Sequence, residues 1–389
     1  MRDSSICLCR SGLDRTALEG LRVSSVTLAW FRNHEQWSSE LDPGLTVLVG
    51  QNAAGKTNIL EAVMVAATGT SFRSFTWEDL VLRGSGEARV SLRATKGETP
   101  TEIDLRITPE GAREFSVNGR RRRRISDVVG RIPLVSFTPE DLSMSKGSSE
   151  MRRAPLDALG DRLSPAYSAL RTEYARLVKQ RNALLKQGAP DTDLGPWDEM
   201  LAGVGSSLTM HRLRLLARMR EPAVTAYARV SGEEQLGIGY RASWDTGEAR
   251  DLDEMALMEK EHVAASILAT LRDGRGRERD RGVTLAGPHR DDIVLSIDGK
   301  PARAYASQGQ HRTISLAWKM AEADVVHAVS GMRPLLLLDD VMSELDSRRR
   351  TELSAYVLEG SQSILTTTNL SYFTEEMLEA AHVVEVGHG

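Results

Sequence analysis

Cysteine is almost absent from this chain of 389 residues, and the only two, Cys7 and Cys9, lie close together near its start. Two cysteines in this position cannot cross-link a fold of this size, and two thiolates alone make a poor metal site. The scarcity of cysteine argues against a disulfide-stabilised scaffold. It favours a reducing compartment, and we expect a cytoplasmic protein.

Long apolar runs are also missing. No stretch reaches the roughly 18 to 20 consecutive apolar residues of a transmembrane helix, so we expect no membrane partner. Residues 1–20 lack the apolar centre of a signal peptide, because Arg10 and Asp14 follow the short apolar stretch at Ile6. We expect residues 1–20 to be a flexible N-terminal extension.

An excess of positive charge is the third absence. The formal net charge is −4, so any contact with nucleic acid must come from local basic patches. With 41% hydrophobic and 27% charged residues, the composition is that of a globular protein with an ample core.

The chain does contain a phosphate-binding motif between two predicted elements. Residues 46–49 read as a buried strand, a helix begins near Asn58, and the residues between them match G-x-x-x-x-G-K-[ST]. The glycines let backbone N–H groups converge on an anion at the helix N-terminus. Lys56 adds a charge for the β- and γ-phosphates, and the Thr57 hydroxyl can bind Mg²⁺. The predicted nucleotide-binding residues are Gly50, Gln51, Asn52, Ala53, Ala54, Gly55, Lys56, Thr57 and Asn58.

Two adjacent acids follow a second buried strand. Residues 334–338 are uninterruptedly apolar, as in a parallel sheet, and Asp339 and Asp340 come next. In a chain that also contains the phosphate-binding motif, known as a P-loop, two acids at the end of such a strand are the Walker B arrangement. We predict that Asp339 completes the Mg²⁺ site with Thr57, and that Asp340 polarises the attacking water. Asp340 and Lys56 are therefore the predicted catalytic residues.

A polar helix start precedes these acids. Ser307, Gln308, Gly309 and Gln310 stand directly before a segment with apolar residues at helical spacing. Serine is a favoured N-cap, and Gly309 permits close approach of backbone to a ligand. The segment is thus a second candidate anion site, although caps of this kind are common and carry little weight alone.

Alternating segments at residues 88–94, 101–107 and 114–117 predict an antiparallel sheet, with a tight turn at Asn118 and Gly119. Five arginines follow this turn. They could grip a phosphate backbone, or they could be a charged edge strand that blocks strand pairing. The sequence leaves both open for Arg120, Arg121, Arg122, Arg123 and Arg124.

The central part of the chain is predicted to be helical. Residues 165–187 show a heptad seam, and a second helix carries apolar residues on one face, so the two form a hairpin about 35 Å long. Arg212 and three nearby arginines are expected on its solvent-exposed face, and contact with DNA is left open for them. Residues 237–244 read as a strand, 254–272 as a helix and 274–282 as a polar loop.

The motifs together resemble the ABC ATPases of the SMC-like branch, in particular the RecF family of bacterial DNA replication and repair proteins. The resemblance is carried by GQNAAGKTN, SQGQHRT (residues 307–313), LLLLDD and SELD. It also rests on FTPEDL (137–142), GPHRDD (287–292) and the KG…RR…LD segment at residues 146–157. The fold class it implies is α/β: a P-loop ABC-type ATPase head, a mixed sheet flanked by helices, with an inserted helical lobe.

The expected division has four parts. Residues 1–20 are the extension, and 21–157 form the N-terminal part of ATPase lobe I with the P-loop. Residues 158–284 form the helical lobe II insert. Residues 285–389 complete the head. They contain the signature segment from Ser307 to Gln310, the Walker B acids and the D-loop residues Ser343 and Asp346.

The resemblance implies a weak, DNA-stimulated ATPase that acts as a switch, with ATP and Mg²⁺ as cofactors. Two copies would enclose ATP, each signature segment from Ser307 to Gln310 completing the site of the other copy. The protein would bind double-stranded and gapped DNA, act with RecR and RecO, and indirectly help to load RecA at single-strand gaps in the response to DNA damage. The alternatives are the ATPase subunit of an SMC-like nuclease and, disfavoured by the insert, a transporter ATPase.

Overall fold

The computed structural model describes residues 20–73, 76–97, 99–245 and 249–387. The expected extension at residues 1–20 lies, except for Gly20, outside the described residues. The chain forms two compact units, one from the described parts of Met1–Asp141 and Glu322–Gly389, the other from Leu142–Ala321. The first expected boundary, at 157, becomes 141 because helix α2 (Ser149–Leu163) packs with the second unit. The second, at 284, becomes 321 because the strand after residue 284 pairs within that unit too.

A parallel sheet holds the nucleotide motifs of the first unit. Its five strands lie in the order β14-β3-β13-β12-β8, and every pairing is parallel. Strands β12 and β13 are buried along their whole length, and burial on both faces explains the continuous apolar sequence of β12. The strands are β3 (Leu45–Val49), β8 (Leu134–Phe137), β12 (Leu335–Asp339), β13 (Ser363–Thr367) and β14 (Ala381–Glu385).

An antiparallel sheet forms the other layer of this unit, in the order β2-β1-β4-β5-β6-β7. Asn118 and Gly119 both have positive φ, as a two-residue hairpin turn between β6 and β7 requires. The sequence therefore located this turn correctly. The strands are β1 (Leu21–Phe31), β2 (His34–Glu40), β4 (Ala88–Lys96), β5 (Thr99–Ile107), β6 (Arg113–Val117) and β7 (Arg120–Arg122).

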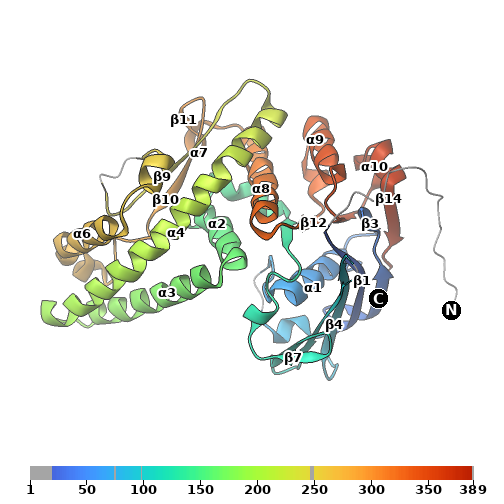
Figure 1. Cartoon of the computed structure of the whole chain (residues 1–389), viewed down its shortest axis with the longest axis horizontal. Helices are drawn as coiled ribbons and strands as arrows, with labels where there is room; N and C mark the ends of the chain where they lie inside the picture. Colours follow the sequence, from blue (N-terminus) through green and yellow to red (C-terminus); the bar gives the residue numbers. More distant parts are fainter. Residues whose placement is uncertain (1–19, 74–75, 98, 246–248, 388–389) are drawn as a thin grey trace. The chain divides into compact units, whose positions relative to one another are not determined.

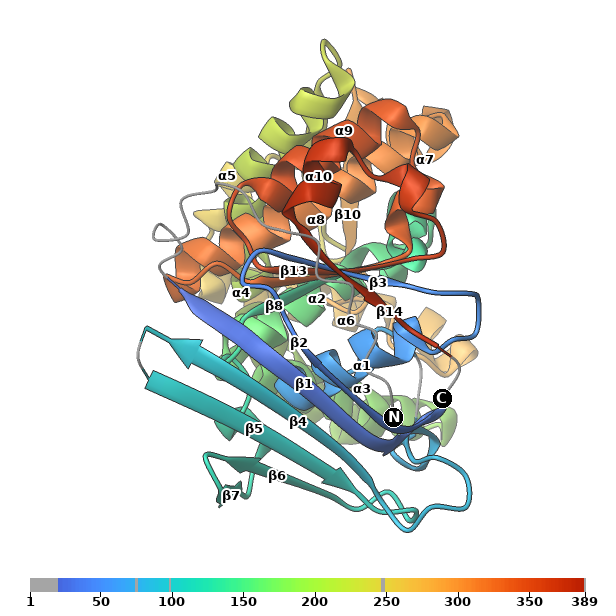
Figure 2. The same ribbon diagram turned by 90° about the vertical axis from the view of Figure 1, so that its right-hand side faces the viewer.

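Helix α1 (Lys56–Thr68) lies between the two sheets, and residues of both sheets join it in one apolar core. Figure 2 shows α9 (Ser347–Leu358) and α10 (Glu375–Ala380) on the opposite face of the parallel sheet. Because α1 is apolar on nearly all sides, it is fixed by packing on both sheets, and the P-loop that precedes it is fixed with it.

The second unit is mainly helical (Figure 1). Helix α3 packs antiparallel to the longer α4, α6 packs on α4, and a small antiparallel sheet has the order β11-β10-β9. No helix among the described residues has the length and apolar character of a membrane span. Besides α2, the elements are α3 (Pro165–Lys186), α4 (Asp191–Ser231), β9 (Leu236–Arg241), α5 (Leu252–Ala256), α6 (Lys260–Arg281), β10 (Asp292–Ile297), β11 (Lys300–Pro301), α7 (Ala302–Tyr305) and the first part of α8 (Gln308–Ser330).

Three predictions about this unit were wrong. Helix α4 has 41 residues, about 60 Å of helix, and is far longer than the predicted arm. The segment 274–282 is helical up to Arg281, because Glu278 points inward to a buried arginine and stabilises helix across two glycines. Arg212 is buried, not solvent-exposed.

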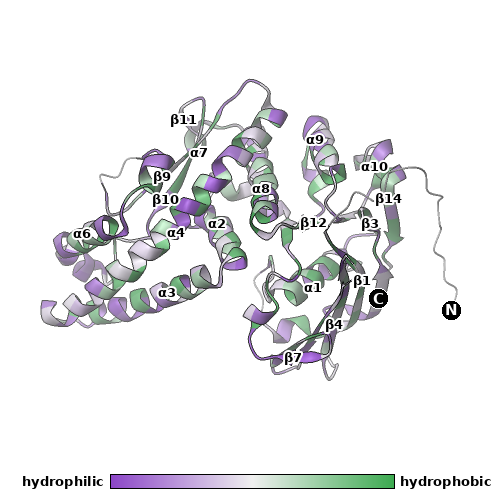
Figure 3. Ribbon diagram, in the orientation of Figure 1, coloured by the Kyte–Doolittle hydropathy of each residue, from purple (hydrophilic) through white to green (hydrophobic). Residues whose placement is uncertain are grey.

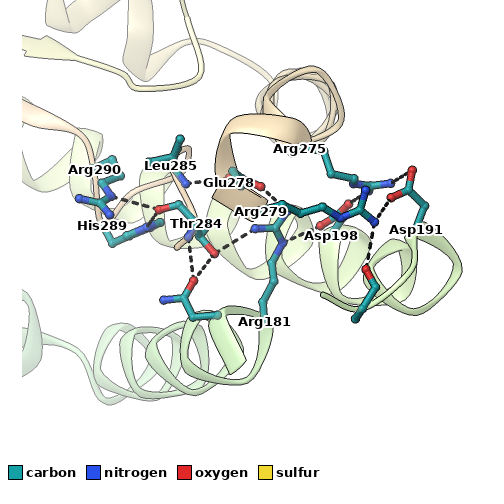
Figure 4. A network of polar contacts seen from close by, with 12 residues as sticks. Arg181, Asp191, Asp198, Arg275, Glu278, Arg279, Thr284, Leu285, His289 and Arg290 are labelled. Carbon is teal, nitrogen blue, oxygen red and sulfur yellow. Dashed lines mark hydrogen bonds and ion pairs between the residues drawn. The ribbon is translucent and has the colours of Figure 1, made fainter. Parts of the chain in front are cut away.

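Buried ion pairs explain the last two differences. Arg181 is fully buried and donates to Asp198 at 2.7 Å, to Glu278 at 2.6 Å and to the Thr284 hydroxyl at 3.0 Å (Figure 4). Arg212 makes two 3.0 Å bonds to Asp157 and a 2.7 Å bond to the carbonyl of Pro288. These contacts join α2, α3, α4, α6 and the loop before β10, and they need residues that are far apart in the sequence.

Candidate nucleotide-binding site

The P-loop lies between β3 and α1, at the carboxyl end of the parallel sheet. Gly55 and Ala53 have φ values of 95° and 64°, and the helix begins at Lys56. Positive φ turns the local N–H groups inward, and glycine adopts it without the steric cost that a side chain brings. The local backbone therefore has the form of an anion nest in front of a helix N-terminus.

Two P-loop glycines are required by close approach, and Gly55 is also required by its positive φ. A Cβ on Gly50 would lie 2.4 Å from the carbonyl oxygen of Val386, and one on Gly55 would lie 2.3 Å from His34 Nε2. His34 is buried, and its Nε2 is 3.1 Å from the Gly55 carbonyl. The β1–β2 turn thus supports the loop from behind, a contact that the motif alone does not indicate.

Lys56 folds back on its own loop. Its Nζ donates to the carbonyls of Gly50 at 2.7 Å and Gln51 at 2.8 Å. Burial lowers the pKa of Lys56, while Asp340 and Asp339 act in the opposite direction. The ammonium group is thereby held over the nest, where it can exchange these carbonyls for phosphate oxygens.

Asp339 is the last residue of β12, and its carboxylate accepts hydrogen bonds from two hydroxyl groups. Thr57 Oγ1 donates to Asp339 Oδ1 at 2.7 Å, and Thr366 Oγ1 donates to the same oxygen at 2.8 Å. The predicted Mg²⁺ residues Thr57 and Asp339 therefore lie together. Since Thr57 donates its proton to Asp339, its oxygen lone pairs can face a cation, and hard oxygen ligands are those that Mg²⁺ prefers.

Asp340 has a strained backbone and a carboxylate whose hydrogen bonds are incomplete. Its φ of 49° is unusual for a residue with a side chain, and its Oδ1 is buried with no hydrogen-bond partner. Burial raises the pKa of Asp340, Asp339 adds to the rise, and Lys56 opposes it. A carboxylate with a raised pKa and a free buried oxygen is suited to accept a hydrogen bond from a bound molecule.

A cavity of about 360 Å³ collects most of these groups. Residues of the predicted P-loop and Asp340 line it together with four residues that the sequence analysis did not name as site residues. Arg73 donates to Asn58 at 3.1 Å, and Asn58 donates to Asn33 at 2.7 Å. The lining residues are Asn33, Asn52, Ala53, Gly55, Lys56, Thr57, Asn58, Arg73, Asp340, Thr366 and Thr368.

The strand order could have revealed Thr366 and Thr368 as site residues. Strand β13 lies between β3 and β12, so its carboxyl end must lie between the P-loop and the Walker B acids. Asn33 and Arg73 follow no motif and could not be found in this way.

The remaining predicted motifs lie outside this cavity. In the D-loop, Ser343 Oγ donates to the Asp340 carbonyl at 2.7 Å, and the Asp346 side chain caps α9. The signature belongs to the second unit. There Ser307 and Gln310 form a capping box: Gln310 N–H donates to Ser307 Oγ at 3.2 Å, and Ser307 N–H donates to Gln310 Oε1 at 2.7 Å.

The signature cap is held in place by a further pair of contacts. Gln310 Nε2 donates to Glu234 at 2.7 Å, and the other carboxylate oxygen of Glu234 accepts from Tyr227 at 2.7 Å. Ser307 and Gln308 are exposed. Because Ser307 Oγ only accepts within the cap, its hydroxyl proton remains available to donate to an anion.

Strand β7, which consists of three of the five arginines, is the hydrophilic edge of the antiparallel sheet (Figure 3), and Arg123 and Arg124 follow it. Arg121 is 3.3 Å from Glu114, whereas the side chains of Arg120, Arg123 and Arg124 have no hydrogen-bond or ion-pair partner among the described residues. Elsewhere on this sheet, Arg93 pairs with Glu102, and Glu87 pairs with both Arg89 and Arg106. Three arginines without a side-chain partner thus lie close together at and just after β7.

Residues 22–388 match the family model described as the RecF/RecN/SMC N terminal domain. A DNA replication and repair protein RecF from Synechococcus sp. (strain JA-3-3Ab) is 38% identical, with 92% of this chain and 94% of the relative covered. The chain belongs to the RecF family. A RecF from Lactobacillus johnsonii is 34% identical, with 94% of this chain and 98% of the relative covered.

Solved structures agree with this assignment. The recombination mediator protein RecF-ATPrS in the RecFOR pathway superposes with a TM-score of 0.83 at 28% identity, over 92% of this chain and 95% of the other. A Pyrococcus furiosus Smc head domain matches with a TM-score of 0.54 at 15% identity, over 95% and 94% of the two chains, which shows the fold alone. The expected fold class, an ABC-type ATPase head with an inserted helical lobe, is confirmed.

Proposed function

We propose that this RecF-family protein is an ATP-dependent DNA-binding protein of replication and recombinational repair, in which ATP binding and slow hydrolysis act as a switch. The observation that carries the proposal is the cavity of the first unit. It joins an anion nest, Lys56 and the partnerless oxygen of Asp340 within one unit. The RecF–ATP structures among its relatives support ATP as the nucleotide.

The side chains divide the work on a triphosphate. The P-loop N–H groups and Lys56 bind the β- and γ-phosphates. Asp340 accepts a hydrogen bond from the water that attacks the γ-phosphate. Thr57 and Asp339 supply oxygen ligands that fit Mg²⁺, which, when bound, neutralises phosphate charge. Lys56→Ala is expected to abolish binding of a fluorescent ATP analogue.

ATP also links two copies of the chain in this proposal. The exposed, preformed cap at Ser307 would donate to the γ-phosphate held by Lys56 of a second copy, as in other ABC ATPases. Residues that act in trans on phosphoryl transfer can contribute about 10³- to 10⁵-fold in rate. The homodimer would form on ATP binding and dissociate after hydrolysis, with the signature segment Ser307, Gln308, Gly309 and Gln310 and the D-loop residues Ser343 and Asp346 at the interface.

Sedimentation with and without ATP tests this arrangement. Ser307→Arg should bind ATP as well as the wild type but remain monomeric, because the bulky cation blocks the cap. Ser307→Thr keeps a hydroxyl cap and serves as the matched control that still dimerises. Tight ATP-dependent dimers of the Ser307→Arg protein would refute the trans arrangement.

DNA is the proposed partner of the closed state, double-stranded or gapped, and RecR and RecO are the proposed protein partners, with RecA acting downstream. The partnerless arginines at the β6–β7 hairpin are the proposed phosphate contacts. Each lost phosphate contact should reduce the slope of log affinity against log salt by about 0.9. Arg123→Ala with Arg124→Ala should therefore weaken binding and flatten the slope, whereas Arg93→Ala, which removes a paired arginine, should do neither.

Labelled gapped DNA with Mg²⁺ and ATP distinguishes this proposal from a nuclease subunit. Binding that requires ATP and leaves the DNA intact supports the switch. Equal affinity with and without nucleotide would contradict the coupling, and cleavage of the DNA would favour the nuclease alternative.

A further inference from the structure

One hydroxyl group lies between the two Walker B acids. Thr366, at the carboxyl end of β13, is only 2% exposed and stands opposite Asp339 in the parallel register. Its Oγ1 donates to Asp339 Oδ1 at 2.8 Å and accepts from the backbone N–H of Asp340 at 2.9 Å. A single side chain thus holds the carboxylate of one acid and the backbone of the other.

The second of these bonds acts on a strained residue. Asp340 has φ 49° and ψ 24°, the left-handed conformation, which residues with a side chain rarely adopt. Such a conformation persists only where the surroundings impose it. The bond from Asp340 N–H to Thr366 provides this constraint, and Oδ1 of Asp340 is left buried without a partner.

The oxygen that accepts from Thr366, Asp339 Oδ1, also accepts a hydrogen bond from a P-loop residue. Thr57 Oγ1 donates to the same oxygen, Asp339 Oδ1, at 2.7 Å. Thr366 therefore fixes the position of the oxygen that orients Thr57. Through Asp339 it acts on the predicted metal ligands, and through Asp340 it acts on the predicted water-activating acid.

We propose that Thr366 is a positioning residue for ATP hydrolysis, whose hydroxyl sets the geometry of Asp339 and Asp340 together. The inference rests on the proposed ATPase function. Thr366 does not bind the phosphates in this proposal. Its loss should lower the rate of hydrolysis and the response to Mg²⁺, and it should leave metal-free nucleotide binding to the P-loop and Lys56.

Thr366→Val is the decisive variant, because valine keeps the β-branched shape of threonine and replaces the hydroxyl with a methyl group that cannot form hydrogen bonds. Thr366→Ser keeps the hydroxyl and is the conservative rescue. Thr46→Val is the matched control: Thr46 is a fully buried threonine of the same sheet, and its hydroxyl accepts the Asp42 N–H at 3.0 Å at the end of β3 away from the P-loop.

The measurements are kcat and KM for ATP, the Mg²⁺ concentration at half-maximal rate, and the affinity for a fluorescent ATP analogue in EDTA. For Thr366→Val we expect kcat to fall by about 10- to 100-fold, as small displacements of catalytic groups cause. The half-maximal Mg²⁺ concentration should rise, and the affinity in EDTA should stay unchanged. Thr366→Ser and Thr46→Val should keep kcat close to that of the wild type.

Two results would overturn the inference while leaving the proposed function intact. One is a folded Thr366→Val protein with the kcat and Mg²⁺ response of the wild type. The other is a Thr366→Ser protein as slow as Thr366→Val, since packing and not the hydroxyl would then matter. If the wild type and Thr46→Val both bind no ATP and hydrolyse none, the proposed function itself fails, and the inference fails with it.

Discussion

In the second unit, the guanidinium group of Arg181 is completely buried and each of its nitrogens donates to an oxygen of Asp198, Thr284 or Glu278. In the first unit, Asp340 has a buried oxygen with no partner, and Lys56 is held by carbonyls of its own loop. Both regions bury charge, but every nitrogen of Arg181 has a partner, whereas Asp340 keeps a buried oxygen without one.

The difference separates structural charge from functional charge. A fully buried charge whose charged partners are buried with it is out of reach of a ligand, and removing one member leaves the others uncompensated. A buried polar atom without a partner, beside a cation that can change partners, lowers stability unless a bound molecule completes it. We therefore expect mutations in the two regions to separate ligand binding from stability.

Lys56→Met and Arg181→Met should have the largest effects, and that of Lys56→Met should be on ATP binding alone. Loss of a charge that faces phosphate is expected to weaken ATP binding by about 2 to 5 kcal/mol, at least about 30-fold. The free energy of unfolding should change by less than about 1 kcal/mol, because Gly50 and Gln51, whose carbonyls are freed, are not buried and water can replace the lost bonds. Isothermal titration and denaturant unfolding measure the two quantities on the same sample.

Arg181→Met should show the reverse pattern. Asp198 and Glu278 would be left buried without their shared partner, which typically costs about 3 to 5 kcal/mol of stability. Urea unfolding measures this loss, and titration of the folded protein should give the ATP affinity of the wild type. A large loss of affinity in folded Arg181→Met would contradict the separation of the two regions.

Acid should weaken the second unit through His289. Burial lowers the pKa of His289 to about 4, and neighbouring arginines add to this, although the contact with the Thr284 carbonyl opposes it. The neutral ring fits its contacts: Nε2 donates to Thr284 O at 3.1 Å, and Nδ1 accepts from Tyr174 at 2.8 Å.

The unfolded chain takes up a proton at His289 near pH 6.5, and the folded chain does so only near pH 4. The contribution of the neutral ring is therefore present above pH 6.5 and is lost as the pH falls to about 4, on the order of 3 kcal/mol in total. Burial raises the pKa of Asp291, which acts in the opposite direction. Urea unfolding of the wild type and of His289→Gln between pH 4 and 7 isolates the histidine, since Asp291 is common to both. Equal pH dependence of the two proteins would contradict this assignment.

Ser307→Ala should have the smallest effect. It removes an N-cap from α8 and should cost about 1 kcal/mol of local helix stability. Hydrogen exchange of the amides of Gln310 and His311 should become faster, while nucleotide binding by the monomer stays the same. Unchanged exchange at Gln310 would show that the capping bond adds nothing measurable.

Much of the fold could be predicted because local pattern and tertiary structure agree. The apolar run before Asp339, the alternating strands and the Asn118–Gly119 turn each have one favoured conformation and a fixed place in a sheet. The helical unit was harder. Residues 274–282 contain three glycines and many charges, and contacts with distant residues, above all the pairing of Glu278 with Arg181, stabilise them as helix up to Arg281.

The sequence by itself determined the ingredients of the site: the glycine spacing that allows an anion nest, the Lys56 charge and the two acids at the end of an apolar strand. Their chemistry is local, so it can be read from neighbouring residues. Only the tertiary structure decided that Thr366 lies between those acids, that His34 supports Gly55, and that Arg212 is buried. Each of these depends on which distant strands and helices lie side by side, and long-range packing sets that arrangement.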